Sequence, residues 1–163
     1  MSGGPRTLDR DAIAARIPHQ GSMCLLAGVD EWNADSIRCH ATSHHDEANP
    51  LREVWGLPAT SAIEYAAQAM AVHGALVAPP GGAPRPGYLA SVRGVEFAVD
   101  RLDTVSGPLD IRAERLTGNG NQILYTFTVA AAGAALVSGR AAVILDADVL
   151  ASGDAGRATR SSA

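Results

Sequence analysis

The sequence predicts an α+β domain in which a curved antiparallel sheet wraps around one buried helix. One long stretch, residues 59–77, lacks proline and carries apolar side chains on nearly every face, as a helix covered on most sides does. The segments on either side have the composition of strands, two before it and four after it. Of the 163 residues, 47% are hydrophobic but only 4% are aromatic, so small aliphatic side chains must build the core.

The N-terminal part predicts a short helix and then a hairpin. Residues 1–15 are expected to be a loose segment in which Leu8–Ala15 can be helical. The apolar run Met23–Val29 predicts the first strand, and Ser36–Ser43 predicts its hairpin partner. The connection over residues 44–58 is long and irregular, and such connections are usually functional.

The central helix is predicted to span Ala59–Val77. Thr60 or Ser61 can cap its start, and Ser61 with Glu64 forms the S-x-x-E pattern of a capping box. Because apolar residues lie on nearly all sides of this helix, we expect it to be buried all round rather than amphipathic.

Four strands are predicted after a loop rich in glycine and proline, residues 79–86. The folded domain is expected to cover residues 16–147, and residues 148–163, rich in Ser, Gly, Ala and Arg, are expected to form a disordered tail. Alternating or β-branched runs mark the four strands as Tyr88–Val99, Leu109–Thr117, Ile123–Ala132 and Ala134–Asp146.

Charge and composition exclude several classes of protein. The net charge of −4 at pH 7 and the lack of any basic run argue against nucleic-acid binding. No window reaches the roughly 18 consecutive apolar residues that a membrane-spanning helix needs, and no apolar signal core begins the chain. Cys24 and Cys39 are too few for a disulfide framework or a zinc site, so we expect buried thiols in a cytoplasmic protein.

Glu64 is the most informative candidate for chemistry. It lies near the start of the helix among Ala62, Ile63 and Ala66. An apolar setting disfavours the charged form of a carboxylate, so its pKa is expected to rise and make it a general acid or base. The alternative is that Glu64 serves only as the capping-box partner of Ser61.

Two adjacent histidines, His44 and His45, follow the second predicted strand. A histidine titrates near neutral pH and suits proton exchange with a carboxylate, although both could equally be solvated loop residues. With Asp46 and Glu47 they could suggest a metal cluster, but adjacent side chains in an extended chain diverge, so no metal is expected. His73 falls on the opposite side of the helix from Glu64 and is expected to be a core or interface residue.

Several phrases resemble one known family, the hotdog-fold 3-hydroxyacyl-[acyl-carrier-protein] dehydratases of the FabZ/FabA group. These proteins begin with an I-P-H segment before an apolar strand, as at Ile17–His19. Their central helix follows a proline and carries E-x-x-x-Q, as at Pro58 and Glu64–Gln68. The segments Tyr88–Phe97 and Gly107–Leu109 are similar to family segments as well.

A narrower likeness is to a divergent branch of that family found in aryl-polyene and xanthomonadin pigment clusters, the ApeP-like proteins. It rests on the phrases N-P-L-R at Asn49–Arg52, I-E-Y-A-A-Q-A-M-A-V-H-G-A-L at Ile63–Leu76 and G-Y-L-A-S-V-R at Gly87–Arg93. The resemblance covers about residues 15–147 and implies the hotdog fold.

The resemblance implies dehydration of a 3-hydroxyacyl thioester, carried by an acyl carrier protein, to the trans-2-enoyl product. It implies that Glu64 is the catalytic carboxylate, that Gln68 is a supporting amide, and that the Ala59 N–H binds the thioester carbonyl. It implies no cofactor and no metal. By the same likeness, the residues expected to bind substrate are Ala59, Gln68, Tyr88 and Leu89.

The chain departs from the FabZ/FabA pattern at the base. The family's catalytic histidine lies in an H-F-P segment whose position here is Pro50, so His44 or His45 must substitute from further back in the loop. Related enzymes combine a histidine and a carboxylate from different subunits, which implies a homodimer or a heterodimer with a second hotdog subunit. Two alternatives stay open: a weakly catalytic or silent partner subunit, and an acyl thioesterase in which Glu64 activates water.

An acyl carrier protein is acidic, and so is this chain, so docking requires a local basic patch. The candidates for this patch are Arg52, Arg85, Arg93 and Arg101.

Overall fold

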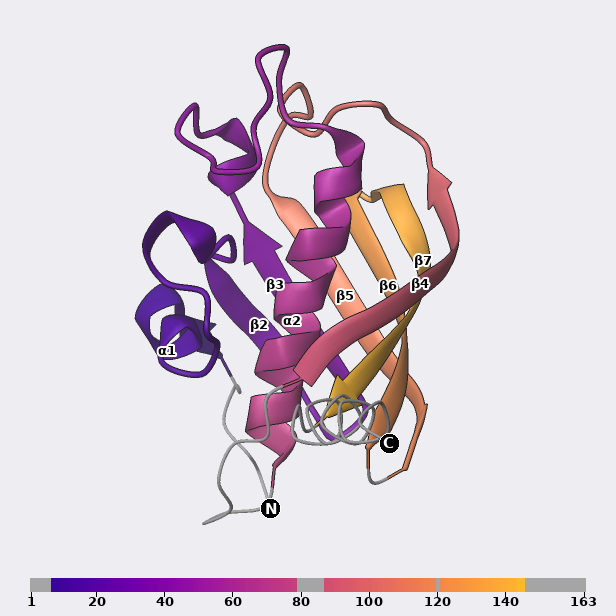
Figure 1. Ribbon diagram of the computed structural model, residues 1–163. Coiled ribbons are helices and arrows are strands. Elements are labelled where there is room, and N and C mark those ends of the chain that lie inside the picture. Colours follow the sequence, from indigo (N-terminus) through magenta and orange to yellow (C-terminus); the bar gives the residue numbers. More distant parts are fainter. Residues whose placement is uncertain (1–6, 79–86, 120, 146–163) are drawn as a thin grey trace, which may run out of the picture.

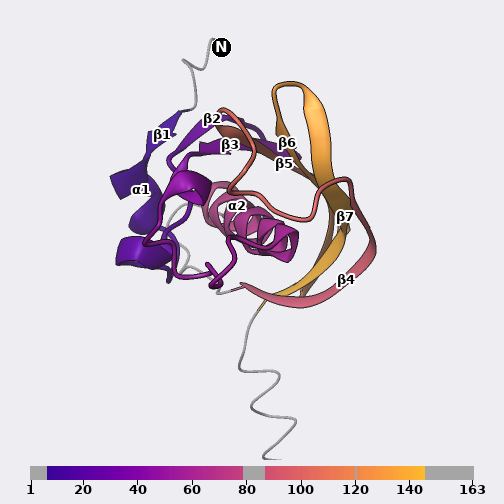
Figure 2. The ribbon, with the colours of Figure 1, turned by 90° about the horizontal axis from the view of Figure 1, so that it is seen from above.

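Seven strands form one antiparallel sheet that curves around a single long helix (Figures 1 and 2). The structure is a computed structural model that describes residues 7–78, 87–119 and 121–145. Viewed along the helix, the sheet encloses it on one side from β1 round to β4, and the segments before the helix lie across the remaining side (Figure 2). The architecture is the α+β arrangement that the sequence predicts.

The strands occur in the spatial order β1-β2-β3-β5-β6-β7-β4, and each is antiparallel to its neighbours. The predicted strands after the helix are confirmed to within two residues at each end. The strands are β1 (Leu8–Asp9), β2 (Gly28–Trp32), β3 (Ser36–Ala41), β4 (Gly87–Phe97), β5 (Leu109–Gly118), β6 (Gln122–Ala131) and β7 (Ala134–Leu145). The helices are α1 (Arg10–Ala14), α2 (Ala62–Val77) and the 3-10 turns η1 (Gly21–Met23), η2 (Ser43–His45) and η3 (Ala59–Ser61).

The long helix starts differently from the prediction, although its span is right. The turn η3 runs directly into α2, so Ser61 already has helical backbone angles of φ −60° and ψ −23°. A capping side chain needs an extended backbone at its own residue to reach the N–H groups ahead of it. Ser61 makes no such hydrogen bond, and the predicted capping box with Glu64 is wrong.

The helix fills the concave side of the sheet. Its fully buried side includes Tyr65, Ala66 and Ala69, and no residue of α2 is fully exposed, as the sequence predicts. A narrower stripe that includes Glu64 and Ala67 is only half-buried. Small alanines on the buried side allow the helix to lie close to β3, β5 and β6.

The predicted first strand, Met23–Val29, is wrong for its first five residues. The strand starts at Gly28, and the segment before it is irregular although Cys24, Leu25 and Leu26 are buried. Gln68 in α2 supplies hydrogen bonds that a neighbouring strand would otherwise make to this segment. Its Nε2 donates to the Met23 oxygen at 2.8 Å, and its Oε1 accepts from the Leu25 N–H at 2.9 Å. The apolar run therefore indicated burial, and a helix side chain supplies the hydrogen bonds that a strand partner would supply.

Strand β4 forms an open edge of the sheet. Among the described strands it pairs only with β7, and most of its 11 residues are exposed. The exposed fraction is 49% for Tyr88, 37% for Leu89 and 46% for Phe97. A long edge strand with exposed apolar side chains is an unusual surface for an isolated protein and favours pairing with another chain.

Several expectations fall outside the described residues, namely the loop 79–86, the tail 148–163 and the first six residues of the N-terminal segment. Among the helices that are described, none is long and apolar enough to cross a membrane.

Candidate active site

The two histidines lie in the turn η2 and differ sharply in exposure. His44 is completely buried, whereas His45 is exposed. Nε2 of His44 lies 3.0 Å from the Gly107 oxygen, and Nε2 of His45 lies 2.6 Å from the Val105 oxygen. The rings lie against each other, with centroids 3.8 Å apart. The sequence predicts that both histidines lie in a loop, but it does not predict which of them is buried.

The protonation of both rings follows from these partners. A carbonyl oxygen only accepts, so Nε2 must carry the proton in each ring, and Nδ1 is the atom left to accept one. Nδ1 of His44 is buried without a hydrogen-bond partner. Burial, followed by the neighbouring His45, lowers the pKa of His44, so this ring stays neutral in the folded protein near neutral pH.

A series of side-chain hydrogen bonds connects the turn η2 to Leu25 and to the helix α2. The Ser43 hydroxyl lies 2.7 Å from both the Leu25 oxygen and the Tyr65 hydroxyl, and Asn49 Nδ2 donates to the Tyr65 oxygen at 3.1 Å. The Leu25 carbonyl can only accept, so Ser43 donates to it and Tyr65 must donate to Ser43. Both hydroxyl groups therefore have a hydrogen-bond acceptor, and the donor of each hydrogen bond in this series is determined.

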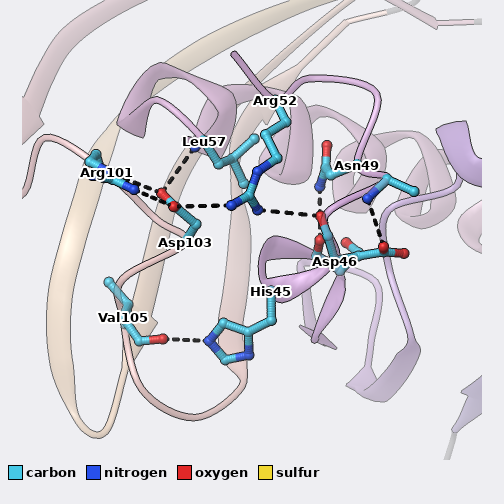
Figure 3. Close-up of polar contacts among 10 residues, drawn as sticks. His45, Asp46, Asn49, Arg52, Leu57, Arg101, Asp103 and Val105 are labelled. Carbon is cyan, nitrogen blue, oxygen red and sulfur yellow. Dashed lines mark hydrogen bonds and ion pairs between the residues drawn. The ribbon is translucent and has the colours of Figure 1, made fainter. Parts of the chain in front are cut away.

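A carboxylate on the neighbouring loop holds the other side of this region (Figure 3). Asp103 is only 6% exposed and accepts two hydrogen bonds from Arg101, at 3.1 and 2.6 Å, and one from the Leu57 N–H at 2.9 Å. Arg52 approaches from the histidine loop at 3.5 Å. Arg101 first, together with the Leu57 N–H, holds the pKa of Asp103 far below its usual range. The loop that carries Val105 is therefore fixed against the segment that leads into α2.

The helix start offers a different N–H group from the expected one. The Ala59 N–H donates to the Asp100 oxygen at 2.9 Å, so it is already used within the chain. The Ser61 N–H donates to the Pro58 oxygen at 3.0 Å. Thr60 is exposed, and its N–H has no hydrogen-bond partner among the described residues. An oxyanion at the helix start would therefore meet the Thr60 N–H first.

The carboxylate and the amide of the helix have separate surroundings. Glu64 is half-buried on the less covered stripe of α2 and has no hydrogen bond or ion pair to any described residue. Gln68 is fully buried and is committed to Met23 and Leu25. Within a single chain, no hydrogen bond joins Glu64 to His44 or His45.

The remaining substrate candidates lie on β4. Tyr88 is paired with Ile144 and Leu89 with Val143, so the two side chains point to opposite faces of the sheet. Val143 is buried, which places Leu89 on the inner face beside the helix. These two residues therefore border the open edge and do not meet the histidine turn within the chain.

Among the surface hollows, one lies beside the histidine turn and another on the outer face of the sheet. The first, of about 390 Å³, is lined by Leu25–Ala27 and by Thr42, Ser43, Asp46, Ala48 and Asn49. The second, of about 280 Å³, lies beside Arg38 and Arg112. Neither is lined by His45 or Glu64, which carry the expected chemistry.

The structure also shows the surroundings of His73, of the two cysteines and of the possible metal ligands. His73 is a buried core residue: its Nε2 donates to the Asn33 oxygen, and its Nδ1 accepts from the Tyr125 hydroxyl. Cys24 and Cys39 are buried free thiols, and burial raises the pKa of Cys39 to about 12. In the described part of the chain, no three metal-binding side chains come together.

Two of the four arginines expected to meet a carrier protein lie together, at Asp103. Arg52 and Arg101 both contact Asp103, so their charge is partly neutralised. Arg93 lies opposite Arg140 across β4 and β7. Arg85 falls outside the described residues.

Sequence reasoning missed the residues that build the turn. Ser43, Asn49 and Tyr65 were ordinary polar positions in the pattern, and Asp103 was one carboxylate among several. The only available signal was indirect: Asn49 and Tyr65 belong to two of the phrases that carry the family resemblance.

A long helix inside a strongly curved antiparallel sheet defines the hotdog fold. Among proteins of this fold, the chain belongs to the ApeP-like dehydratase family, whose model matches residues 11–152.

Solved structures agree with this assignment. A chain of the dehydratase heterocomplex ApeI:P from Xenorhabdus doucetiae has a TM-score of 0.73 and 26% identity, over 82% of this chain and 90% of that one. A thioesterase from Staphylococcus aureus (TM-score 0.58, 11% identity, 72% of this chain and 91% of that one) has the same fold. A Haemophilus influenzae thioesterase (0.54, 13%, 72% and 76%) also shares it. Among curated protein sequences, none matches this chain.

Proposed function

We propose that this chain dehydrates 3-hydroxyacyl groups carried on an acyl carrier protein in aryl-polyene biosynthesis, as one subunit of a complex with a second hotdog protein. The observation that carries the proposal is Glu64, a carboxylate on the less covered side of α2 with no partner in the described chain, in a member of a dehydratase family. A carboxylate that stabilises structure normally has a hydrogen-bond or ionic partner, so a half-buried one without any is suited to act on a bound molecule.

The reaction needs three groups in this account. A histidine of the turn η2, His44 or His45, removes a proton from C2 of the thioester through Nδ1. Glu64, in its protonated form, transfers a proton to the C3 hydroxyl, which leaves as water while the C2–C3 double bond forms. The N–H at the helix start, that of Thr60 in this chain, donates to the thioester oxygen as negative charge develops on it.

Three observations support a site that is shared between subunits. No hydrogen bond connects Glu64 with the histidines in one chain, because His44 and His45 are bonded to the Gly107 and Val105 carbonyls. The edge strand β4 is open, with Leu89 and Phe97 exposed. The similar Xenorhabdus doucetiae chain comes from a dehydratase heterocomplex. A second subunit that pairs with β4 would extend the sheet and cover the half-buried stripe of α2 that bears Glu64.

The test is product analysis by intact mass of a 3-hydroxyacyl carrier protein. It is incubated with the chain alone, with the second hotdog subunit alone, and with both. Loss of one water that requires this chain supports the proposal. Release of unloaded carrier protein would show a thioesterase instead. Equal dehydration by the second subunit with and without this chain would show that this chain has no catalytic part.

A further inference from the structure

We propose that His45 is the base of the pair, through its Nδ1 atom, and that His44 is a positioning residue that holds the His45 ring. The inference rests on the proposed function and deepens it by assigning different tasks to two adjacent histidines. It also identifies the reacting nitrogen as the one nearer the backbone.

The choice of atom follows from the carbonyl partners. Nε2 of His45 is 2.6 Å from the Val105 oxygen, a short distance that requires a proton between them. Nε2 is therefore a donor in both the neutral and the charged ring and cannot take a proton from substrate. Nδ1 of His45 has no hydrogen-bond partner among the described residues, so its lone pair is available.

The choice of residue follows from access. His44 has no exposed surface, and its unpartnered Nδ1 is enclosed by the chain itself. A second subunit can only add to that burial, so substrate cannot reach His44 without opening of the turn. His45 is exposed in the single chain, where a partner and a bound acyl group could enclose it.

The arrangement also explains what His44 does. Its ring lies 3.8 Å from the His45 ring, and its own Nε2 is tied to Gly107, two residues beyond Val105. One ring edge of His45 is thus fixed by a carbonyl and one ring face by His44. A base held on two sides needs little reorganisation to reach a reactive geometry.

Glutamine substitutions separate the two tasks. In His45→Gln and His44→Gln, the side-chain amide can still donate to the respective carbonyl, but the basic nitrogen is lost. Both variants are assayed in the full complex with a 3-hydroxyacyl carrier protein, and thermal unfolding and complex formation are measured in parallel. We expect His45→Gln to lower kcat about 100-fold or more, the usual contribution of a general base, with the fold and the complex intact. We expect His44→Gln to lower kcat by at most about tenfold and to reduce thermal stability.

The pH dependence of kcat/KM gives a second readout that a purely structural role would not change. In His44→Gln the pH profile of wild type should be retained, because the proposed base, His45, is intact. In His45→Gln the residual activity should not follow that profile. A kcat in His44→Gln equal to or lower than that of His45→Gln would overturn the inference while leaving the proposed function in place. A wild-type complex whose dehydration does not require this chain would remove the proposed function and this inference together.

Discussion

The phenolic oxygen of Tyr65 lies 2.7 Å from the hydroxyl oxygen of Ser43. Tyr65 directly follows Glu64 in α2, and Ser43 directly precedes His44 in η2. This one hydrogen bond therefore connects the helix that carries the carboxylate to the turn that carries the histidines. Asn49, which donates to the same phenolic oxygen and to the Ser43 carbonyl, closes the connection.

Removing this hydroxyl in Tyr65→Phe should destabilise the chain by about 1–3 kcal/mol, because the Asn49 amide loses a buried acceptor. Denaturant unfolding measures the change. Tyr88→Phe is the matched control, since Tyr88 is half-exposed and makes no side-chain hydrogen bond to a described residue. Equal stability of the Tyr65→Phe variant and the control would mean that the hydrogen bonds of the Tyr65 hydroxyl contribute nothing to the free energy of unfolding.

Gln68 should be needed to hold the irregular segment before β2. In Gln68→Leu, the partly buried Met23 oxygen and the buried Leu25 N–H lose their partners, which should cost about 1–3 kcal/mol. Hydrogen exchange should show faster exchange of the Leu25 amide, with the β5–β6 amides little changed. Gln122→Leu, at the exposed start of β6, is the control. Protection of Leu25 that persists in Gln68→Leu would contradict this role.

The stability of the protein should fall as the pH drops below about 6.5. Burial is the main cause that lowers the folded-state pKa of both His44 and His73 from the ordinary value of 6.5. The unfolded chain therefore binds protons first, so stability is complete above about pH 6.5 and is lost as the pH falls through the folded-state pKa values. Unfolding midpoints across this range measure the slope. His44→Gln should reduce the slope, and an unchanged slope would show that His44 is not the titrating group.

The open edge of the sheet should mediate assembly. Phe97 is 46% exposed on β4, opposite the buried Val137, so it lies on the inner face of the strand. Phe97→Ser should weaken association with the second subunit, or self-association, by about tenfold or more, as removal of an aromatic interface residue commonly does. Light scattering with size-exclusion chromatography measures the assembly. Arg112→Ser on the outer face of β5 is the control, and equal assembly of both variants would place the interface elsewhere.

Much of the fold was predictable because burial leaves a strong pattern. The helix over Ala59–Val77 was evident from apolar residues on all its faces, and alternation marked the strands after it. The pattern failed at Met23–Val29 because an apolar run reports burial and not the source of the backbone hydrogen bonds, which Gln68 supplies from a distant part of the chain. It failed at Ser61 because a 3-10 turn shifted the helix start.

The candidate site was predictable in its residue types but not in its connections. Glu64 and the histidine pair could be selected from the sequence, since few ionisable residues lie beside buried elements. The partners of the histidines could not be predicted, because Val105 and Gly107 reach the turn only through the folded loop. The difference in exposure between His44 and His45 is likewise a property of the tertiary structure.

The most direct test of the account is the turnover of Glu64→Gln in the assembled complex, followed by intact mass of the 3-hydroxyacyl carrier protein. Glu114→Gln, an exposed carboxylate on the outer face of β5, is the matched control. We predict that the control loses water from the substrate at the wild-type rate and that Glu64→Gln is slower by about 100-fold or more with the complex intact. Wild-type turnover by Glu64→Gln would contradict the central claim that this carboxylate carries the proton to the leaving hydroxyl.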